Sequence, residues 1–372
     1  MKIRFNSVFQ SDKYNRYMAD LFSDYEFFRN KKYSALCQEE LALVFGQNTY
    51  HLLTHSATGG LEMIAKAMDI RPGDEIIMPS FTFVSTANAF VSHGAIPVFA
   101  DISISDFNLA FTEIEKKISE KTRAVVVTHY GGHSTNLDAI RQLCDAHQLI
   151  MIEDAAMAFG NSYNGQPLGT IGDMGVISFD ITKQISAIQG GVLLVNTPDF
   201  MDRLDAIYHI GTNRTRFETQ KVPYYEWIDT GSKYQMNELN AVALYDNLLN
   251  RAHILNKRKE LSRIYFNELS SYADLILPEH KLQENIHLFY LLARSEEERE
   301  ALRHHLSEKG IEAMFHYIPL HTSKMGKKFP SGILPVTDHV SGCLLRLPLH
   351  TGMSEQDVVE VGCEIKQFYN GR

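Results

Sequence analysis

The sequence contains few cysteines and no cysteine pair. Its four cysteines, Cys37, Cys144, Cys343 and Cys363, are scattered along the chain, and no C-x-x-C motif is present. The spacing of zinc sites and of redox motifs is therefore absent, and isolated thiols are typical of reduced residues in a cytosolic protein. We accordingly expect a cytoplasmic protein that needs neither disulfides nor a metal ion to fold.

Long apolar runs and an excess of basic residues are also absent. No segment approaches the ~20 apolar residues that span a bilayer, and the first residues mix charge and polarity, unlike a signal peptide. Of 372 residues, 36 are Lys or Arg and 45 are Asp or Glu, so the formal net charge is −9. Sequence-independent nucleic-acid binding depends on clustered basic side chains. We therefore expect neither a nucleic acid nor a membrane as partner, while a locally basic pocket leaves room for a small anionic substrate.

The dinucleotide-binding fingerprint G-x-G-x-x-G does not follow the first apolar run, which argues against a dehydrogenase. The sequence instead alternates short apolar runs with amphipathic helical stretches between about residues 50 and 200. Nearly continuous apolar runs are typical of strands covered by helices on both faces, and such alternation indicates an α/β fold with a mostly parallel sheet. Seven strands are expected, at residues 51–54, 75–80, 96–101, 124–130, 149–155, 174–180 and 191–196.

The pattern changes after residue 236. Residues 237–269 have the apolar spacing of one long helix, and weaker strands are expected at residues 287–293 and 344–349. We therefore predict a large domain over residues 1–236 and a smaller α+β domain over residues 237–372, with the long helix at its start.

Four segments near predicted strand ends carry candidate functional residues, because open α/β sheets bind ligands at the carboxyl ends of their strands. The first segment, His55 to Gly60, joins a strand to a helix. Small residues, hydroxyls and a helix N-terminus are suited to binding a phosphate. An ordinary N-cap by Ser56 or Thr58 is the alternative.

The other three segments supply a carboxylate, a lysine and aromatic rings. Asp154 ends a buried strand, where a carboxylate is costly unless it faces positive charge, such as a protonated ring nitrogen; a helix cap or a buried ion pair is the alternative. Lys183 follows another strand and precedes the glycine pair 190–191, so it is a candidate to form a Schiff base, although most lone lysines are solvated. Phe81 and Phe83 are candidates to cover a flat ring, although most phenylalanines pack in the core.

In their order and spacing, these parts match a pyridoxal-phosphate pocket. The chain resembles the DegT/DnrJ/EryC1/StrS family of sugar aminotransferases, which have the type I aminotransferase fold. The resemblance covers nearly the whole chain, and its most specific segments are PSFTFVSTANAF and FHYIPLH. Further matching segments are residues 71–78, 153–156, 168–175, 178–183, 211–214 and 231–236. Within the family, the chain is similar to the transaminases that make dTDP-4-amino-4,6-dideoxy sugars.

The resemblance implies a role for each site residue. Lys183 binds the cofactor covalently and later moves the proton between substrate and cofactor, and Asp154 keeps the pyridine nitrogen protonated, which makes the ring an electron sink. The other cofactor-binding positions that it implies are Ser56, Ala57, Thr58, Phe83, Met157, Ser178 and Lys233. The resemblance further implies a homodimer with shared active sites, in which Lys233 reaches the phosphate bound by the neighbouring subunit.

The resemblance also implies the substrates. L-glutamate gives its amino group to the cofactor, which passes it to the C4 keto carbon of a dTDP-4-keto-6-deoxyhexose, with the galacto isomer expected for use in surface polysaccharide. We expect ping-pong kinetics, because one pocket accepts both partners in turn. Arg214, Tyr317 and His321 are the candidates for binding the sugar nucleotide. For Arg214, a surface ion pair is the alternative.

Three positions depart from the family pattern. Met157 stands where Gln is usual, Gln189 where Glu is common, and Lys233 where Asn is common. Lys183 follows the pattern and favours transamination, since family members that eliminate carry His at this position. Two other functions stay open at this stage: amination of another nucleotide sugar, at C3 or at C4 with opposite stereochemistry, and a non-catalytic cofactor-binding regulator. Of the 16 histidines, only His321, with His316 and His129 as weaker candidates, has a place near this chemistry.

Overall fold

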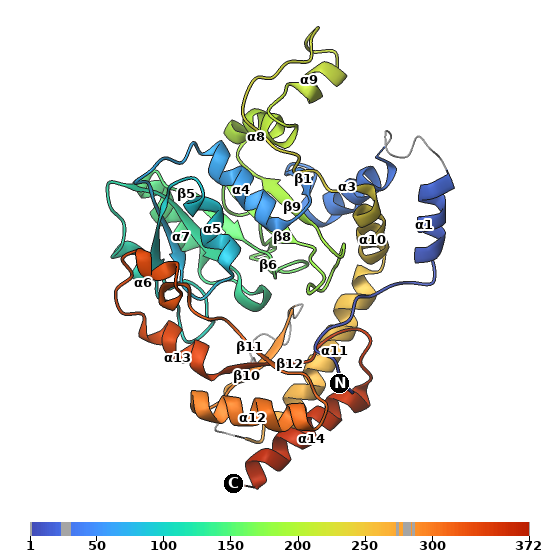
Figure 1. The fold of residues 1–372 in the computed structure, drawn as a ribbon, viewed down its shortest axis with the longest axis vertical. Helices are drawn as coiled ribbons and strands as arrows, with labels where there is room; N and C mark the ends of the chain where they lie inside the picture. Colours follow the sequence, from blue (N-terminus) through green and yellow to red (C-terminus); the bar gives the residue numbers. More distant parts are fainter. Residues whose placement is uncertain (1, 24–30, 273–274, 278–283, 285–286, 372) are drawn as a thin grey trace.

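A seven-stranded sheet forms the centre of the larger part of the molecule (Figure 1). The computed structural model describes residues 2–23, 31–272, 275–277, 284 and 287–371. The strand order is β1-β9-β8-β5-β4-β2-β3, with all neighbours parallel except β9, which is antiparallel to both β1 and β8. The strands are β1 (Tyr50–Thr54), β2 (Glu75–Pro79), β3 (Ile96–Ala100), β4 (Thr122–Thr128), β5 (Ile150–Asp154), β8 (Met174–Ser178) and β9 (Gly191–Val195). The expected α/β fold is confirmed, and every predicted strand overlaps an observed one.

Side chains alternate between the two faces of this sheet, and each face has its own hydrophobic core. In β4, Val125 and Val127 face one core, whereas Ala124 and Val126 face the other. Because helices cover both faces, the strands are apolar along their length, which explains the continuous apolar runs. The first face is covered by α3 (Lys32–Phe45), α7 (Leu137–His147) and α10 (Glu238–Leu249), and the second by α4 (Ala57–Ala67), α5 (Val84–Val91) and α8 (Met201–Tyr208).

The smaller part of the molecule contains a three-stranded antiparallel sheet in the order β10-β12-β11 (Figure 1). Its strands are β10 (Phe289–Leu292), β11 (Met314–Phe315) and β12 (Leu344–Leu347). One face packs into a core with α11 (Arg251–Leu269), α12 (Glu296–Glu308) and α14 (Glu355–Asn370). The opposite face contacts the larger part through a cluster that includes Phe81 and Tyr130. The small sheet therefore forms one wall of the contact between the two parts.

The segment expected to be one long helix forms two helices, α10 and α11, which meet at Asn250. Asn250 has φ −102° and ψ 11°, and its side chain donates to the carbonyl of Asp246 at 2.7 Å. An asparagine side chain that bonds to nearby backbone competes with the helical pattern. Neither glycine nor proline marks this break in the sequence. The domain boundary at residues 236/237 stays a prediction.

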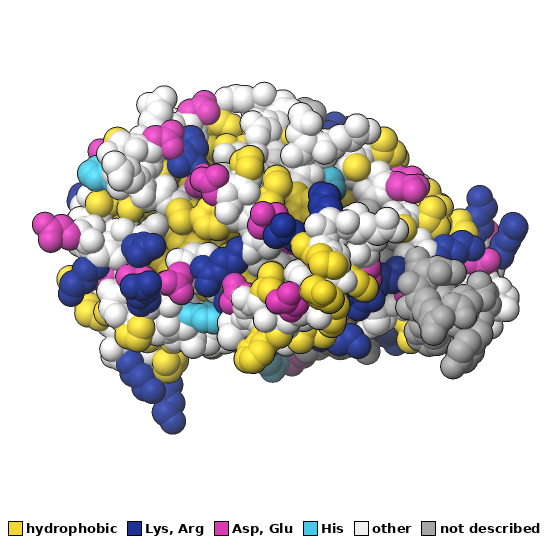
Figure 2. All heavy atoms as spheres, turned by 90° about the horizontal axis from the view of Figure 1, so that it is seen from above, with side chains coloured by type: hydrophobic (Ala, Val, Ile, Leu, Met, Phe, Trp, Pro, Cys, Tyr) yellow, Lys and Arg dark blue, Asp and Glu magenta, His cyan; other side chains and the backbone are white. Residues whose placement is uncertain are grey.

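A short arm projects from the end of the larger part, next to α8, and carries α9 (Arg214–Glu218) (Figure 1). Figure 2 looks onto this end and shows apolar, basic and acidic side chains intermixed. Several large apolar side chains of the arm are exposed, among them Trp227, Tyr224 and Ile228.

The remaining elements are α1 (Tyr14–Ser23), α6 (Phe111–Glu115), α13 (Pro335–Cys343) and the short hairpin of β6 (Ser162–Tyr163) and β7 (Gln166–Pro167). Within the described ranges, the helices are too short or too polar to cross a membrane.

Candidate active site

The carboxyl edge of the parallel strands brings the predicted cofactor segments together. Gly191, the first residue of antiparallel β9, pairs with Thr54 at the end of β1 and with Ser178 at the end of β8. Asp154 ends β5, the next strand of the sheet. The segment after Thr54, the hydroxyl of Ser178 and the carboxylate of Asp154 therefore lie along one edge, where such sheets bind ligands.

The segment after β1 forms the N-terminus of α4. Ser56 is the N-cap, and its Oγ accepts a hydrogen bond from the amide of Gly59 at 3.0 Å. Thr58 Oγ1 lies 2.7 Å from Ser85 Oγ of α5. The first turn of α4 contains no acidic residue, so no carboxylate of this turn offsets the partial positive charge of the helix end. The N-cap alternative is therefore realised, and it is compatible with phosphate binding at the same helix end.

Gly191 allows this helix end to lie directly against the sheet edge. A Cβ on Gly191 would fall 2.7 Å from the carbonyl carbon of Ser56 and 2.9 Å from Cα of Ala57. Real Cβ atoms essentially never show such distances. A side chain at position 191 is therefore sterically excluded, because the backbone of Ser56 and Ala57 lies directly against Gly191, the strand partner of Ser178.

Asp154 is buried and accepts hydrogen bonds only from neutral groups in the described part of the chain. Thr86 Oγ1 donates to its Oδ2 at 2.6 Å and the amide of Ala156 to its Oδ1 at 3.2 Å. Thr86 is itself held by Thr82, at 2.9 Å. Of the alternatives, a buried ion pair is not formed among the described residues. Because its hydrogen-bond donors are neutral, no positive charge among them compensates this buried carboxylate, and a protonated ring nitrogen would supply one.

The neighbouring carboxylate, Glu153, has a different environment. It accepts hydrogen bonds from His129 Nε2 at 2.8 Å and from the amides of Gly169, Ile171 and Gly172 at 2.6–2.8 Å. Burial alone would raise the pKa of Glu153, but these donors hold it below its ordinary value. Glu153 thus holds the loop of residues 169–172, and the Nε2 of His129 is used in the hydrogen bond to this carboxylate.

Lys183 follows β8, in a turn that its amide closes by donating to the carbonyl of Asp180 at 2.9 Å. The pKa of Lys183 is lowered to about 8, chiefly by burial of the ammonium; the charges of Asp154 and Asp180 oppose this shift, and that of Arg346 adds to it. A half-buried lysine whose amine feels the charge of Asp154 differs from the fully solvated lysine that was the alternative. Its lowered pKa makes the neutral, nucleophilic form accessible near neutral pH.

The two phenylalanines of the PSFTF segment have different environments. Phe81 is fully buried, with its ring centroid 4.9 Å from Tyr130 and 5.5 Å from Tyr317. Phe83 is 56% exposed, and its ring centroid lies 6.4 Å from that of Tyr317. The core-packing alternative is therefore correct for Phe81, whereas the exposed ring of Phe83 is available to cover a flat ring.

The FHYIPLH segment reaches the same region from the smaller part. Tyr317 contacts both Phe81 and Phe83, and burial raises its pKa. His321 is fixed between Ser80 Oγ, 2.7 Å from its Nδ1, and Asp338 Oδ1, 3.3 Å from its Nε2. His316 Nδ1 lies 3.2 Å from the hydroxyl of Tyr130, and burial keeps its pKa well below the ordinary value.

The side chains of three predicted residues are placed away from this edge: Arg214 and Lys233 are exposed, and that of Met157 is buried in a hydrophobic cluster. Arg214 lies on the arm and forms an ion pair with Glu218 at 2.7 Å, so the surface ion pair expected as the alternative is present. Lys233 is exposed, next to Tyr234, whose ring stacks on His55 at 5.9 Å. The side chain of Met157 is buried in the interdomain cluster, and its carbonyl accepts from Gln184 Nε2 at 3.2 Å.

Several residues near the site were not predicted. Ser85 forms a hydrogen bond with Thr58, and Thr86 donates one to Asp154. Their hydroxyl side chains, which follow PSFTF closely in the sequence, could have indicated a role at the site. Arg346 is the one charged residue of β12, and its position in the apolar segment LLRLPL was an available signal. Gln184 gave no comparable signal, because its contacts are made with distant backbone carbonyls.

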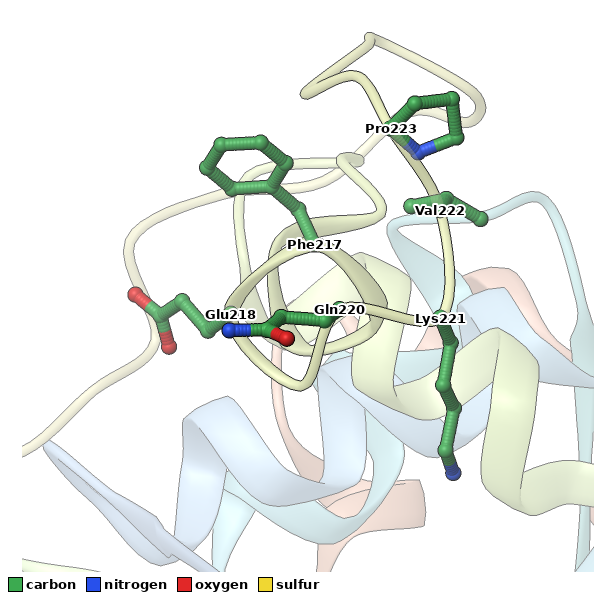
Figure 3. A pocket seen from close by; sticks show the side chains of 6 residues that line it. All are labelled: Phe217, Glu218, Gln220, Lys221, Val222 and Pro223. Atoms are coloured by element: carbon green, nitrogen blue, oxygen red, sulfur yellow. The ribbon is translucent and has the colours of Figure 1, made fainter.

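The pocket drawn in Figure 3 is separate from this edge. It is lined by six residues of the arm, namely Phe217, Glu218, Gln220, Lys221, Val222 and Pro223. Figure 3 shows Glu218 and Lys221 pointing in different directions, so the polar groups do not converge as they do in ligand sites. We assign the chemistry to the sheet edge, where hydroxyls, a carboxylate and the lysine converge.

In the described part of the chain, no group of three or more His, Cys, Asp or Glu side chains is arranged to hold a metal ion.

The fold and the site define a class of protein. A type I aminotransferase fold, with a helix N-terminus free of acidic residues in its first turn, a strand-end carboxylate and a half-buried lysine, has the donor set that pyridoxal phosphate needs: amides and hydroxyls for the phosphate, a carboxylate for the ring nitrogen and an amine for the aldehyde. The glycine at 191 leaves the space for this arrangement.

Comparison with known proteins identifies the family. Residues 17–366 match the DegT/DnrJ/EryC1/StrS aminotransferase family, so the chain belongs to this family. It is 32% identical over 342 residues to the uncharacterized protein MJ1066 of Methanocaldococcus jannaschii, covering 89% of this chain and 88% of the relative. It is 29% identical over 331 residues to GDP-perosamine synthase of Escherichia coli O157:H7, covering 87% and 86%.

The fold is also that of solved relatives. The putative sugar aminotransferase Spr1654 of Streptococcus pneumoniae, in its PMP form, superposes with a TM-score of 0.91 at 22% identity and covers 99% of both chains. The same protein has been solved in a PLP form, with a TM-score of 0.89. The protein is a pyridoxal-phosphate-dependent enzyme of the sugar aminotransferase family. The alternative of a non-catalytic regulator is therefore dropped.

Proposed function

We propose that this enzyme transfers the amino group of L-glutamate to the C4 keto carbon of a dTDP-4-keto-6-deoxyhexose. The product is a dTDP-4-amino-4,6-dideoxy sugar of the galacto configuration, made in the cytoplasm for surface polysaccharide. The observation that carries the proposal is the half-buried Lys183, whose pKa is lowered to about 8 and whose amine feels the charge of the buried Asp154 carboxylate. The resemblance of nearly the whole chain to dTDP-4-amino-4,6-dideoxygalactose transaminase supports the choice of sugar.

Each cofactor-binding residue has a chemical task in this proposal. When bound, pyridoxal phosphate supplies an aldehyde for the amine and a ring that accepts electrons. Asp154 would keep a proton on the ring nitrogen. Lys183 would move the proton between the substrate carbon and the cofactor carbon. Phe83 covers one face of the ring. The phosphate is held by Ser56, the amide of Ala57, Thr58 and Ser178.

The substrate residues come from the second wall of the site. Tyr317 lies between Phe81 and Phe83, so its hydroxyl is a candidate to orient the sugar. His321 is held by Ser80 and Asp338, and this fixed ring is the second candidate. Neither residue needs to move the catalytic proton, which remains the task of Lys183.

The proposed enzyme is a homodimer with shared active sites. Lys233 and Arg214 are exposed in their own protomer, and we assign them to the partner's site, Lys233 to the cofactor phosphate and Arg214 to the substrate pyrophosphate or carboxylate. The exposed Trp227, Tyr224 and Ile228 of the arm give this end apolar surface for a second copy. A second subunit would bury these side chains.

A GDP-4-keto sugar is the second candidate substrate. It is favoured by the 29% identity to GDP-perosamine synthase over most of the chain. The test is the reaction of the enzyme with glutamate and a panel of dTDP-, UDP- and GDP-linked keto sugars, with product stereochemistry determined by NMR. Conversion of dTDP-4-keto-6-deoxyglucose to the 4-amino galacto product supports the proposal. Exclusive conversion of a GDP sugar, or amination at C3, contradicts it.

A further inference from the structure

Gln184, the residue directly after Lys183, is buried and forms three hydrogen bonds to distant segments. Its side-chain Nε2 donates to the carbonyl of Met157 at 3.2 Å and to that of Phe159 at 3.3 Å. Its Oε1 lies 2.7 Å from Nδ1 of His287. The two carbonyls belong to the segment that follows β5, whereas His287 precedes β10 of the smaller part. Gln184 therefore links the larger part to the smaller part at the position next to Lys183.

These contacts fix which nitrogen of His287 carries the proton. The amide nitrogen of Gln184 has two N–H groups and two carbonyl acceptors, so the amide oxygen faces His287 and can only accept. Nδ1 of His287 is therefore the donor. Burial, followed by the charges of Lys183 and Arg258, holds the pKa of His287 well below its ordinary value, so the ring is neutral.

His287 is itself held by Arg258 of α11. The guanidinium of Arg258 donates to the carbonyl of His287 and, at 2.7 Å, to the carbonyl of Leu349. Gln184, His287 and Arg258 are all buried. A buried hydrogen-bonded network of this kind is rigid, and removal of one member leaves its partners unpaired.

The turn that carries Lys183 is exposed on its N-terminal side. Ile181 and Thr182 are exposed, and Lys183 is half-buried. Gln184 is the first buried residue after them, so its side chain fixes where the chain returns to the interior. The carbonyl of Ile181 also accepts from Asn6 Nδ2 at 2.7 Å, but this contact is exposed. The buried bonds of Gln184 are therefore the firmer restraint on Lys183.

We propose that Gln184 and His287 are positioning residues for Lys183, and that their hydrogen bond holds its turn so that the amine stays at the site and out of bulk water. This inference rests on the proposed role of Lys183 and adds the residues that act through it. Reacting atoms must approach to about 3–3.5 Å in a defined direction. Because a lysine side chain is a flexible four-carbon stem, its amine returns to one place only if the backbone that carries it is fixed.

The alternative is a purely structural contact that holds the two parts together. A matched contact crosses the same boundary elsewhere, because Thr337 Oγ1 of α13 donates to Asp101 Oδ1 at 2.7 Å and both residues are buried. Asp101 directly follows β3, which lies four strands from β8, about 19 Å at ~4.8 Å per strand. Thr337→Val thus removes one buried hydrogen bond between the parts, away from Lys183.

The first measurement uses the apoenzyme and does not depend on turnover. Lys183 is labelled with an amine-reactive reagent at a series of pH values, and the labelled peptide is quantified by mass spectrometry. The wild-type midpoint should lie near pH 8, because the pKa of Lys183 is lowered to about 8. In His287→Leu, which lacks the donor, the midpoint should rise toward about 10.4, the pKa of a solvated lysine. In His287→Asn, whose amide nitrogen replaces Nδ1, it should stay near 8.

The second measurement separates turnover from substrate binding in the holoenzyme. His287→Leu should lower kcat ~30-fold and leave both KM values within about threefold, because a displaced amine slows proton transfer without changing substrate contacts. His287→Asn should keep kcat within about threefold of wild type. Thr337→Val should lower the melting temperature, as His287→Leu does, but leave the labelling midpoint and kcat unchanged.

A second variant covers the case in which His287→Leu does not fold. Gln184→Met has a side chain of similar length but lacks all three hydrogen bonds of Gln184. It should raise the labelling midpoint and lower kcat as His287→Leu does. Circular dichroism and thermal melting establish that each variant is folded.

The outcomes separate this inference from the proposed function. A folded His287→Leu with a lower melting temperature but an unchanged midpoint and kcat would make the contact purely structural and overturn the inference. Equal changes in His287→Asn and His287→Leu would also overturn it, since the donated hydrogen bond would then have no effect. If borohydride attaches the cofactor to another lysine of the wild type, the proposed role of Lys183 is wrong, while a raised midpoint in His287→Leu would still show that the pair positions its amine.

Discussion

Two adjacent buried carboxylates, Glu153 and Asp154, have different environments and, in our proposal, different tasks. Glu153 accepts from His129 and from three backbone amides, which satisfies a buried charge within the protein. Asp154 accepts from Thr86 and the amide of Ala156, both neutral. Since a carboxylate of the second kind gains most from a cationic ligand, the difference between the two residues is what assigns cofactor chemistry to Asp154.

Replacement of Asp154 by Asn should therefore reduce turnover more than stability. Without the carboxylate, the ring nitrogen loses the group that keeps its proton, and turnover should fall ~10²-fold or more. Steady-state kinetics with saturating cofactor measure this effect. In contrast, Glu153→Gln should lower the free energy of unfolding by ~3–5 kcal/mol, because it leaves buried donors without their charged acceptor. Equal losses of stability in the two variants would contradict this division.

The pH dependence of cofactor binding follows from Lys183. Burial lowers its pKa to about 8, so the ammonium loses its proton as the pH rises through about 8, well below the usual pKa near 10.4. Only the neutral amine attacks an aldehyde. The rate of pyridoxal-phosphate uptake by the apoenzyme, followed by absorbance, should therefore rise with pH to a plateau with its midpoint near 8. A midpoint at 10 or above would show that the lysine is solvated.

At the scale of elements, the site depends on the approach of α4 to β9. Gly191 allows this approach, because a Cβ there would overlap Ser56 and Ala57. Gly191→Ala should push the helix end away from Ser178. We expect an unfolding free energy lower by ~1–3 kcal/mol, as for other overpacked sites, and ~10-fold weaker cofactor binding in an equilibrium titration.

Gly342→Ala is the matched control for this change. Gly342 lies in α13, where a Cβ would lie 3.8 Å from Cβ of Glu296, an ordinary contact. Alanine is favoured over glycine in a helix, so cofactor affinity should be unchanged and stability equal or slightly higher. Unchanged cofactor affinity in Gly191→Ala would mean that the α4 end does not hold the phosphate.

The sequence predicted the elements whose signal is local and missed those whose signal is not. Strand β9 was predicted because burial on both faces makes its residues apolar, and β5 because of the apolar residues that precede its two terminal carboxylates. The break at Asn250 was missed, since no glycine or proline marks it, and the two-residue strands β6, β7 and β11 are too short for a period. At the candidate site, Lys183 and Asp154 were predicted from their positions at or just after strand ends. Arg346 was missed because its face toward the larger part depends on the register of β12.

At the scale of the whole molecule, the site is formed between two parts and, in our proposal, between two subunits. Lys183 and Asp154 come from the large sheet, and Tyr317 and Arg346 come from the smaller part. Arg214 and Lys233 are exposed in their own protomer. Their predicted roles therefore require a second copy of the chain, arranged so that each protomer completes the other's site.

Complementation between two inactive variants tests this arrangement. Lys183→Ala and Lys233→Ala should each reduce activity, and after subunit exchange a mixed dimer contains one site with both lysines intact. An equal mixture should recover about a quarter of wild-type activity, since about half of the dimers are mixed and each has one of two sites. Activity assays after mixing measure the recovery. No recovery, with exchange demonstrated by differently tagged subunits, would place Lys233 outside the partner's site.

The central claim is that Lys183 is the residue that binds the cofactor. Its most direct test is borohydride reduction of the yellow holoenzyme, followed by peptide mass spectrometry to locate the phosphopyridoxyl group. We predict a single modified residue, Lys183, and no modification at this peptide in Lys183→Ala. Stoichiometric modification of another lysine, or a protein that takes up no pyridoxal phosphate, would contradict the account.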